Sequence, residues 1–395
     1  MSRRVLVLSF YYPPDLSAGS FRVHALVNAI KKKLTLSDSI HVVTTMPNRY
    51  ASFNVDAVDS EKQENLTISR IKLPNHQSGI VDQAVAFLYF AWRVNKLIKK
   101  GGDYELVVAT SSRLMTGVLG SRIARKMNAK YYLDIRDIFC ETMNELYPTF
   151  LLKPVLNLFS RLECFAINKA DKLSLVSEGF LPYFRERYPS QSFAVFTNGI
   201  DDEFLTQNNS IKKCDNKFSK LNVVYAGNIG DGQGLHKIIP DLAERLTDKI
   251  NFKIIGDGGR KKNLELIIEN RRIKNVEIHE PVTRQRLIQY YLEADVLFLH
   301  LNKCKAFLSV LPSKIFEYAA LGKPLWLGVD GHSAEFSKRE ISNVAIFTPC
   351  DVEQAVRVLE TLGLSVVERK SFIKKYRRVN IMEKMAEDIL DLLNK

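Results

Sequence analysis

Short apolar segments alternate with longer amphipathic segments along almost the whole chain, and this alternation limits the possible folds more than any other feature. Segments of this length rich in Val, Ile, Phe and Tyr predict buried strands, and the stretches between them are long enough for helices. Strands that alternate with helices predict parallel sheets covered on both faces, so we expect an α/β protein. The apolar segments read VLVLSF, IHVVTT, TISRIKL, ELVVAT, KYYLDI, LSLVS and FAVFT, and then LNVVYAG, NFKIIG, NVEIHEP, DVLFLHL, LWLGV and VAIFT.

The length and one polar stretch predict two domains. A chain of 395 residues is too long for one typical core, and two domains of about 200 residues each are expected. Residues 207–220 (QNNSIKKCDNKFSK) have the composition of a linker. We therefore place the domain boundary between residues 199 and 220.

The net charge indicates an anionic partner for the first half of the chain. The formal net charge is +13, and residues 1–200 hold 26 Lys and Arg against 17 Asp and Glu, a net charge of +9. Nucleic acid, a membrane surface and phosphorylated substrates would each be attracted to such a surface. The aromatic and basic strands typical of RNA-binding modules are absent, which disfavours nucleic acid.

Targeting signals and cysteine usage predict a protein of the reducing cytoplasm. The sequence has no apolar run long enough to span a membrane. The first residues (MSRRVLVLSFYYPPD) predict a strand and not a signal peptide, because the apolar run ends at two prolines without a small-residue cleavage site. The cysteines are odd in number, widely spaced and without a CxxC pair, which predicts neither a disulfide framework nor a zinc site; they are Cys140, Cys164, Cys214, Cys304 and Cys350.

No cofactor and no metal ion are expected. The GxGxxG pattern of dinucleotide-binding proteins is absent after the first strand, which argues against a nicotinamide cofactor. Asp201 and Asp202 are adjacent acids in a turn without a third ligand, and no other Asp-x-Asp metal signature occurs.

Residues 303–329 (KCKAFLSVLPSKIFEYAALGKPLWLGV) contain the strongest candidate site. They predict a loop, a helix that starts near Pro312, a turn and a buried strand. Lys314 lies in the first helical turn, where a cation opposes the positive end of the helix dipole unless an anion binds there. Glu317 shares its face. The two side chains suit a ligand with phosphates at one end and hydroxyls at the other; an ion pair on a solvated helix face is the alternative.

Two glycine-rich turns in the second half each follow a strand and begin a helix. They are residues 227–234 (GNIGDGQG) and 256–259 (GDGG), and backbone N–H groups at such helix starts bind phosphate. Arg260, Lys261 and Lys262 again place cations at a helix start, which suggests a diphosphate between the turns. A solvated basic turn is the alternative for Lys261 and Lys262.

Two positions in the first half resemble binding positions of a parallel sheet. Gly19 begins the first helix just after the first strand, where a glycine permits close approach of a phosphate or sugar and equally serves as a cap with Ser20. Arg136 and Asp137 follow the strand KYYLDI, and ligands of such sheets bind at the carboxyl ends of the strands. A surface ion pair is an equally good explanation of Arg136 and Asp137.

Two predicted helices combine aromatic and Leu side chains with Lys and Arg. They lie near residues 85–100 (within AVAFLYFAWRVNKLIKK) and 147–169 (beginning YPTFLLKPVLNLFSRL). Such a composition is typical of helices that lie on an anionic membrane surface. Core packing accounts for the apolar residues nearly as well, and the sequence does not decide which helix would dock.

Seven motifs, taken in order, resemble one known family. The chain is similar to the family 4 retaining glycosyltransferases, which have the glycosyltransferase B fold of two Rossmann-like domains facing across a cleft. It looks closest to the bacterial surface-polysaccharide branch that includes the N-acetylfucosaminyl transferases. The resemblance spans the whole chain and rests on YYPPDLSAGS, LDIRD, LVSEGF, FTNGID, YAGNIGDGQGL, IIGDGG and LPSKIFEYAALGKP.

The resemblance implies a role for each domain. Residues 1–198 would bind the acceptor and dock on the membrane, residues 199–372 would bind the nucleotide sugar, and residues 373–395 would form a helical segment that crosses back onto the first domain. Lys314 would neutralise the diphosphate and Glu317 would hold the ribose hydroxyls. The implied catalytic residues are Asp137, Arg136 and Lys314; the implied donor-binding residues are Gly19, Asn228, Gly230, Gln233, Gly256, Arg260, Val282, Lys305, Ser309, Lys314 and Glu317.

The sequence departs from the family pattern at three of these positions. The family often has a second Glu eight positions before Glu317, and here that position is Ser309. The glycine-rich turn of the family often has an Arg and a Lys where this chain has Asn228 and Gln233. Other cations must then neutralise the diphosphate; the candidates are Arg260, Lys303, Lys305 and Lys314.

The expected activity is transfer of a sugar from a nucleotide sugar, most simply a UDP-sugar, to a polyprenyl-diphosphate-linked glycan. The reaction would retain the configuration of the sugar and need no metal ion. It would belong to bacterial O-antigen or capsule synthesis. No residue stands out as a carboxylate nucleophile, which favours a front-face route in which the departing phosphate oxygen takes the acceptor proton. The enzyme would be cytoplasmic and peripheral on the inner membrane. The alternatives are a nucleotide-sugar epimerase or hydrolase of the same fold and a basic nucleic-acid-binding module.

Overall fold

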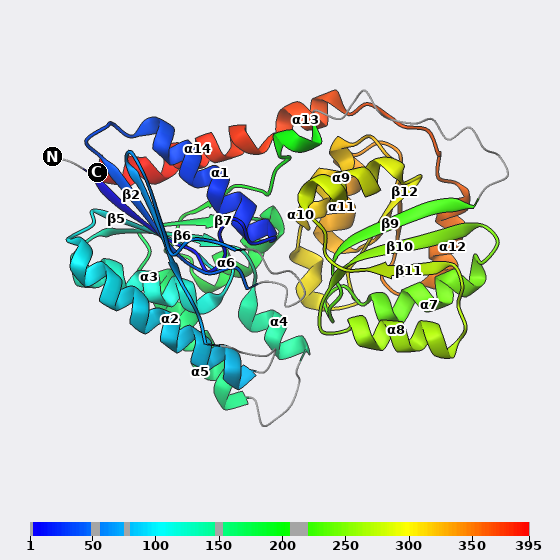
Figure 1. Cartoon of the computed structure of the whole chain (residues 1–395), viewed down its shortest axis with the longest axis horizontal. Helices are drawn as coiled ribbons and strands as arrows, with labels where there is room; N and C mark the ends of the chain where they lie inside the picture. Colours follow the sequence, from blue (N-terminus) through cyan, green and yellow to red (C-terminus); the bar gives the residue numbers. More distant parts are fainter. Residues whose placement is uncertain (1–2, 49–55, 75–79, 147–152, 206–219, 395) are drawn as a thin grey trace. The chain divides into compact units, whose positions relative to one another are not determined.

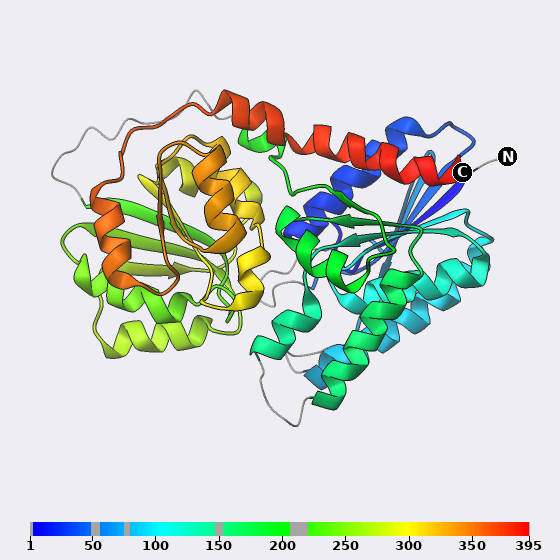
Figure 2. The same cartoon turned by 180° about the vertical axis from the view of Figure 1, so that it is seen from behind.

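The protein is described from a computed structural model, which covers residues 3–48, 56–74, 80–146, 153–205 and 220–394. The chain divides into two compact units, shown in Figure 1 and from behind in Figure 2: the N-terminal unit is Met1–Asn198 with Arg378–Lys395, and the C-terminal unit is Gly199–Arg377. Each unit contains a largely or wholly parallel sheet, so the predicted α/β class is confirmed. The predicted linker, residues 207–220, lies outside the described residues except for Lys220.

The N-terminal unit is built on an eight-stranded sheet with the order β3-β4-β2-β1-β5-β6-β7-β8. All neighbouring strands are parallel except β3 and β4. Its elements are β1 (Arg4–Leu8), α1 (Ala18–Lys33), β2 (Ser39–Thr45), β3 (Ser60–Gln63), β4 (Leu66–Ile71), α2 (Ile80–Gly101), β5 (Leu106–Thr110), α3 (Leu114–Met127), β6 (Lys130–Ile135), α4 (Phe139–Leu146), α5 (Lys153–Asn168), β7 (Lys172–Leu175), α6 (Leu181–Arg187), β8 (Phe193–Val195) and α14 (Arg378–Leu390).

Helices cover both faces of this sheet (Figure 1). On one face α1 and α14 pack against each other, and their apolar side chains join those of β1, β2, β4 and β5 in one core. α14 is also fixed by its Asp388, which accepts a hydrogen bond from Tyr132 of β6 at 3.0 Å and pairs with Lys172 of β7. On the other face α3 packs on β5 and β6, with α2 and α5 beside it. The C-terminal helix is therefore part of the N-terminal core.

The C-terminal unit is built on a six-stranded parallel sheet with the order β11-β10-β9-β12-β13-β14. One core lies between the sheet and α9, α10, α11 and α13, and a second lies between the sheet and α7, α8 and α12. The elements are β9 (Leu221–Asn228), α7 (Leu235–Arg245), β10 (Ile250–Asp257), α8 (Lys261–Asn270), β11 (Val276–His279), α9 (Arg284–Glu293), β12 (Val296–His300), α10 (Ser313–Ala320), β13 (Leu325–Gly328), α11 (Gly331–Glu340), β14 (Val344–Phe347), α12 (Val352–Glu360) and α13 (Lys370–Tyr376).

Both sheets have a topological switch point, where the order of the strands reverses. It lies between β1 and β5 in the N-terminal unit and between β9 and β12 in the C-terminal unit. Ligands of open parallel sheets bind outside the carboxyl ends of the strands at such a point. The fold therefore directs attention to the residues that follow these four strands.

The amphipathic α2 has two apolar faces. Phe87 and Phe90 are 6% and 0% exposed and belong to the core, so for these two residues the structure has the core packing that was the alternative to membrane docking. The opposite face exposes Val85, Leu88 and Trp92, which are 53%, 66% and 56% exposed. None of the helices in the described ranges combines the length and apolarity needed to cross a membrane. The start of the second candidate helix, residues 147–152, lies outside the described residues.

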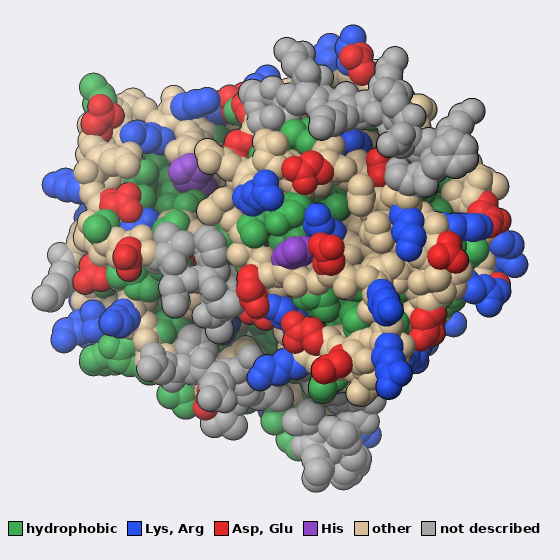
Figure 3. Space-filling view, turned by 45° about the vertical axis from the view of Figure 1, so that its right-hand side comes forward, with side chains coloured by type: hydrophobic (Ala, Val, Ile, Leu, Met, Phe, Trp, Pro, Cys, Tyr) green, Lys and Arg blue, Asp and Glu red, His purple; other side chains and the backbone are tan. Residues whose placement is uncertain are grey.

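The excess of positive charge is not visible as a single basic surface on the side of the molecule shown in Figure 3. There, Lys and Arg side chains are interspersed with Asp and Glu side chains. Charges of mixed sign cancel at distances beyond about 10 Å in physiological salt.

Candidate functional site

The turn after β9 is shaped by close packing against the turn after β10. Gly227 and Gly256 face each other in the sheet, and a Cβ on Gly256 would lie 1.8 Å from the carbonyl oxygen of Gly227. A Cβ on Gly258 would lie 2.6 Å from the carbonyl oxygen of Ile229. These glycines are therefore required by contacts between the two backbones, in addition to any role in binding a ligand.

Gly227 also makes room for Lys314. A Cβ at position 227 would lie 2.5 Å from Cε of Lys314 and 3.5 Å from its Nζ, so the lysine side chain lies across the backbone of the glycine-rich turn. Gly227 has a φ of 154°, a conformation that residues with a Cβ rarely adopt. The first glycine of the turn thus places an ammonium group at the carboxyl end of β9.

Lys314 and Glu317 both lie on α10 and both are available to a ligand. Glu317 is 7% exposed and Lys314 is half-buried. Within the described residues neither side chain makes a hydrogen bond or an ion pair within 4.0 Å, so the alternative of a simple ion pair between them is not what the structure has. Burial lowers the pKa of Lys314, the Glu317 carboxylate opposes this, and Arg284 lowers it further. An anion beside Lys314 would reverse this destabilisation of the charged form.

The position of α10 is fixed by contacts at its C-terminal end. The hydroxyl of Tyr318 accepts a hydrogen bond of 3.3 Å from the backbone N–H of Ala226 in β9. The buried Arg369 donates to the carbonyl oxygens of Ala319, in the last turn, at 3.1 Å and of Lys323, just after the helix, at 3.0 Å. These side chains were not identified from the sequence, because their partners are distant along the chain. They hold Lys314 and Glu317 against the carboxyl end of β9 without contacting the expected ligand position.

The remaining residues of the glycine-rich turn are held by hydrogen bonds. Asn228 donates to the side-chain oxygen of Gln233 at 2.8 Å, and a Cβ on Gly230 would lie 2.5 Å from the Asn228 amide nitrogen. Nδ1 of the buried His300 donates to the carbonyl oxygen of Gln233 at 2.6 Å, and its Nε2 accepts from the backbone N–H of Cys350 at 3.0 Å. Asn228 and Gln233 thus fix the loop, where the resembled family has phosphate-binding cations.

His300 was not identified as a functional residue from the sequence, since it lies within an apolar strand. Burial lowers its pKa to about 4, the Gln233 carbonyl opposes this, and Lys237 lowers it further. The imidazole is therefore neutral at pH 7 and acts as a fixed link between the turn after β9 and the loop after β14. A lone His in a strand offers no signal from which this role could be predicted.

Several cations proposed to neutralise a diphosphate already have carboxylate partners. Arg260 pairs with Asp231 at 2.7 Å, and Lys261 pairs with Glu280. Arg284, at the start of α9, pairs with Asp201 and, at 2.8 Å, with Glu203. Asp201 is thus an ion-pair partner of an arginine. Lys314 differs from these residues in having no such partner among the described residues.

A pocket of about 260 Å³ lies at the carboxyl ends of β12, β13 and β14. Lys303 and Lys305 line it from the loop after β12, and Asp330 lines it from the residues after β13. Both lysines are exposed, and Ser309 lies at the end of the 3₁₀ helix Lys305–Ser309. Val282 follows β11 at the same edge and is partly buried against the core. The donor-binding residues predicted between positions 228 and 317 thus gather along one edge of the C-terminal sheet.

Gly19, Arg136 and Asp137 belong to the N-terminal unit. Gly19 lies in the first turn of α1, where Ser17 accepts a hydrogen bond from the backbone of Ser20 at 3.1 Å and caps the helix. Arg136 and Asp137 follow β6, so these three residues lie at the carboxyl edge of the N-terminal sheet. Asp137 is exposed, and burial lowers the pKa of Arg136 to about 10.

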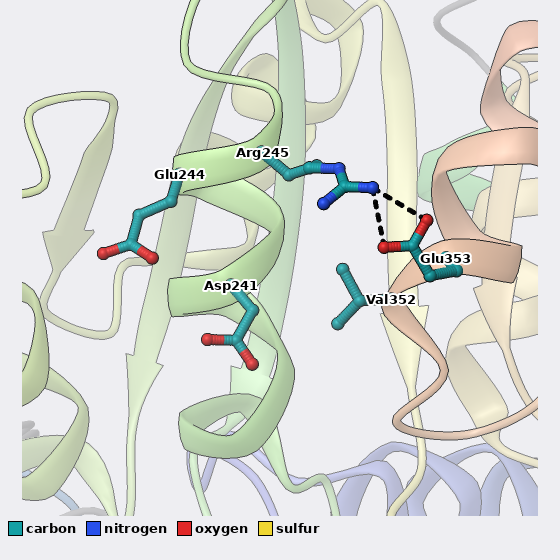
Figure 4. A pocket seen from close by; sticks show the side chains of 5 residues that line it. All are labelled: Asp241, Glu244, Arg245, Val352 and Glu353. Atoms are coloured by element: carbon teal, nitrogen blue, oxygen red, sulfur yellow. Dashed lines mark hydrogen bonds and ion pairs between the residues drawn. The ribbon is translucent and has the colours of Figure 1, made fainter.

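A second hollow of the C-terminal unit, drawn in Figure 4, contains none of the predicted site residues. It lies between α7 and α12, and Arg245 and Glu353 make an ion pair of 2.7 Å across it. Both side chains are more than half exposed. Exposed pairs of this kind bind water readily and contribute little to stability. Within the described residues no group of three His, Cys, Asp or Glu side chains is placed to hold a metal ion, in this hollow or elsewhere.

A family match was found for the C-terminal part of the chain. Residues 207–379 match the family of glycosyl transferases group 1. The putative colanic acid biosynthesis glycosyl transferase WcaI of Escherichia coli (strain K12) is 31% identical over 159 residues, which are 40% of this chain and 36% of WcaI. The matched part thus spans about a third of the length of that relative.

The solved structures that are similar to this chain match both of its units. Sucrose-phosphate synthase of Thermosynechococcus elongatus has a TM-score of 0.74 at 11% identity and covers 99% of each chain. HepE of Anabaena, solved in complex with UDP-glucose, has a TM-score of 0.68 at 14% identity and covers 98% of this chain and 99% of the other. The expected fold, two Rossmann-like domains of the glycosyltransferase B type, is confirmed. The residues that match the glycosyl transferases group 1, 207–379, include Lys314 and Glu317.

Proposed function

We propose that the protein is a glycosyltransferase that moves a sugar from a nucleotide sugar, most simply a UDP-sugar, to a glycan acceptor. The single observation that supports this most is the position of Lys314 across Gly227 at the switch point of a sheet, with no ion-pair partner for its ammonium among the described residues. Diphosphates bind at this place in proteins with parallel sheets. The family of residues 207–379 and the similarity to a structure that contains UDP-glucose support the same class of donor.

Lys314 and Glu317 have complementary tasks in this proposal. The ammonium of Lys314 neutralises the diphosphate and stabilises it as it departs, which is the largest electrostatic demand of the reaction. The Glu317 carboxylate accepts hydrogen bonds from the two ribose hydroxyls, and its near-complete burial makes an unpaired state unfavourable until these donors arrive. The other donor-binding residues, from Asn228 to Ser309, form the edge along which the nucleotide and sugar lie.

The transfer retains the configuration of the sugar and uses no metal ion. The departing phosphate oxygen takes the proton of the acceptor hydroxyl on the same face of the sugar, while the protein supplies position and charge. Arg136 and Asp137 orient the acceptor at the carboxyl edge of the N-terminal sheet. Gly19 at the start of α1 leaves room for a sugar or phosphate group.

The proposed acceptor is a glycan linked to a polyprenyl diphosphate, in the synthesis of a bacterial surface polysaccharide such as O-antigen or capsule. The name of the matched relative WcaI, a putative colanic acid biosynthesis glycosyl transferase, supports a polysaccharide product. A lipid-linked acceptor requires the protein to work at a membrane surface. The proposed location is the cytoplasmic face of the inner membrane.

The exposed face of α2 is the proposed membrane contact. Val85, Leu88 and Trp92 follow one another at helical spacing on this face, and the exposed Lys96 and Lys99 continue it. Apolar side chains that enter the lipid next to cations that meet anionic headgroups are typical of interfacial helices. On α5 the exposed apolar residues are Val155 and Leu158, at 38% and 55% exposed.

The proposed function is tested with a panel of nucleotide sugars in two steps. First, thermal unfolding is measured with each compound, since a ligand at a hundred times its dissociation constant raises the free energy of unfolding by about 2.7 kcal/mol. Second, the stabilising donor is incubated with the protein, with and without a lipid-linked glycan. A transferase consumes the donor only when the acceptor is present. Consumption without an acceptor would indicate a hydrolase or epimerase and contradict the proposal.

A further inference from the structure

Arg136 shares one face of the N-terminal sheet with two other arginines. Successive side chains of a strand point to opposite faces, so Asp134 and Arg136 lie on the side of β6 that α1 and α14 cover, and Asp137 lies on the other side. Asp137 accordingly lines a mainly apolar pocket with Ile135 and Phe139. Arg22 of α1 and Arg378 at the start of α14 complete the group, and both are at most 2% exposed.

One of these arginines is fully matched by a carboxylate. Arg22 donates from Nε and Nη2 to the two oxygens of Asp134 at 3.0 Å and 2.9 Å, and from Nη1 to the carbonyl oxygen of Thr197 at 2.8 Å. Asp134 also accepts from the hydroxyl of Ser174 at 2.8 Å. The negative charge of Asp134 is therefore already balanced by Arg22.

Arg136 is not matched in this way. Its Nε and Nη1 atoms are buried and have no hydrogen-bond partner among the described residues. Burial and the guanidinium groups of Arg22 and Arg378 lower the pKa of Arg136, against the opposing effect of Asp134 and Asp137. Arg136 as a whole is half-buried. Buried N–H groups of a guanidinium that have no acceptor are unfavourable, and water alone would satisfy the hydrogen bonds without balancing the charge.

Three hydroxyl groups at the same edge also have no hydrogen-bond partner in the part of the chain that the structure describes. Ser20 is on the buried face of α1, and Thr110 and Ser112 lie at the end of β5, which is paired with β6 through Thr110 and Asp134. Ser20 and Thr110 are 0% and 3% exposed. Oγ of Ser112 lies 3.4 Å from the position a Cβ on Gly19 would take, so this hydroxyl faces the first turn of α1. All of these groups can donate hydrogen bonds.

We propose that Arg136, with Ser20, Thr110 and Ser112, binds a phosphate group at the switch point between β1 and β5. A tetrahedral oxyanion accepts several hydrogen bonds at once and balances the guanidinium charge, as neither water nor a neutral sugar can. This inference rests on the proposed function for the identity of the phosphate. In a polyprenyl-diphosphate-linked acceptor it is the phosphate next to the glycan. Arg136 thereby recognises the acceptor by its phosphate, and this contact fixes the position of the attached glycan.

Isothermal titration calorimetry on the full chain tests this with two probes, farnesyl diphosphate as a soluble prenyl diphosphate and UDP. The variants are Arg136→Met, which keeps the length of the side chain, and the control Arg125→Met, which removes an exposed cation from α3 of the same unit. We expect Arg136→Met to weaken farnesyl diphosphate binding at least tenfold and to leave UDP binding within twofold, and Arg125→Met to change neither.

The contradicting outcomes are distinct. Unchanged farnesyl diphosphate binding by Arg136→Met would overturn the phosphate site, and an equal loss of UDP binding would show that Arg136 holds the donor and overturn the assignment to the acceptor. If wild-type protein fails to bind UDP, the proposed donor is wrong, while the farnesyl diphosphate measurement still decides whether Arg136 binds a phosphate.

Thermal unfolding in phosphate-free buffer separates binding from a structural role. An unmatched buried charge does not stabilise the fold, so Arg136→Met is expected to unfold at the same temperature as the wild type or a higher one. Adding pyrophosphate should then raise the unfolding temperature of the wild type more than that of the variant. A marked fall in the unfolding temperature of Arg136→Met without phosphate would assign Arg136 to the core and overturn the inference.

Discussion

The carboxyl edges of the two sheets have the same strand order around their switch points, and each contains cations that a carboxylate pairs with and a cation that none of the described carboxylates pairs with. In the C-terminal unit Arg260, Lys261 and Arg284 have carboxylate partners and Lys314 has none among the described residues. In the N-terminal unit Arg22 has Asp134, and Arg136 keeps two buried N–H groups without partners there. We infer that cations paired with a carboxylate stabilise the edge of the sheet, and that an unpaired cation binds a ligand. The two kinds of cation should therefore respond differently to substitution.

The largest effect on stability is expected from Arg22→Met. This change leaves the Asp134 carboxylate buried without its bidentate partner, and breaking a buried pair from one side costs about 3–5 kcal/mol. Chemical unfolding at pH 7 measures the loss. Lys33→Met is the control on the same helix, because Lys33 pairs with Glu387 at 2.8 Å in a partly exposed position and such pairs contribute roughly 1 kcal/mol or less. Equal losses for the two variants would show that matching of Arg22 is not what stabilises this edge.

The next largest effect is expected on turnover, from Lys314→Met. Removal of one preorganised charge contact lowers the rate on the order of a hundredfold, equivalent to about 2.7 kcal/mol. The free energy of unfolding should stay the same or rise slightly, since Lys314 is a cation at a helix N-terminus that burial also disfavours. Steady-state kinetics and unfolding are measured together. Lys338→Met, which removes an exposed lysine from α11 of the same unit, should leave both unchanged.

A smaller effect, on the pH dependence of the free energy of unfolding, is expected for His300. It can be measured without any ligand. The folded-state pKa of about 4 lies below the ordinary value of 6.5, so protonation favours unfolding as the pH falls from about 6.5 to 4. Between pH 7 and pH 5 this removes about 2 kcal/mol of the free energy of unfolding. His41 in the N-terminal unit, whose pKa burial and Arg4 also lower to about 4, should contribute similarly.

The readout for His300 is the slope of stability with pH. His300→Phe loses hydrogen bonds at every pH, which lowers the unfolding free energy uniformly, and should also reduce the decrease between pH 7 and pH 5. His41→Phe should reduce the decrease by a comparable amount. An unchanged pH dependence in both variants would mean that the pKa of each imidazole is the same in the folded and the unfolded protein, which would contradict the account.

The smallest effect is expected for the exposed face of α2. Leu88→Ala and Trp92→Ala remove apolar area that would enter a lipid surface, and each should weaken binding to anionic vesicles on the order of tenfold, about 1.4 kcal/mol. Leu266→Ala, which removes an exposed side chain of α8 in the other unit, is the control. Co-sedimentation at low salt measures binding. Equal binding by all three variants would exclude α2 as the membrane contact.

The fold was readable from the sequence because both kinds of periodicity are strong. The strand VLVLSF and the helix after it appear as β1 and α1, and the strands near LNVVYAG and NFKIIG appear as β9 and β10. Local pattern also placed Lys314 in the first turn of a helix after a strand. The apolar pattern of α2 did not show which of its residues are buried, because Phe87 and Phe90 face the core while Leu88 and Trp92 face outward.

Ion pairs between residues that are distant along the chain could not be predicted from the sequence. Nothing near Arg260 or Lys261 indicates that their partners are Asp231 and Glu280, and Arg22 is 112 residues from Asp134. Gly227 has a local signature as a turn residue, but its contact with Lys314 arises only when β9 and α10 pack together. Whether a cation is free to bind a ligand thus depends on tertiary contacts, which a single sequence does not show.

The most direct test of the donor site is calorimetric titration of UDP into the full chain and into two variants, Lys314→Met and Glu317→Gln. The account predicts one UDP per wild-type chain and at least tenfold weaker binding in each variant, with the control Lys338→Met like the wild type. If both variants bind UDP as the wild type does, the C-terminal edge described here is not the place where the nucleotide sugar is held.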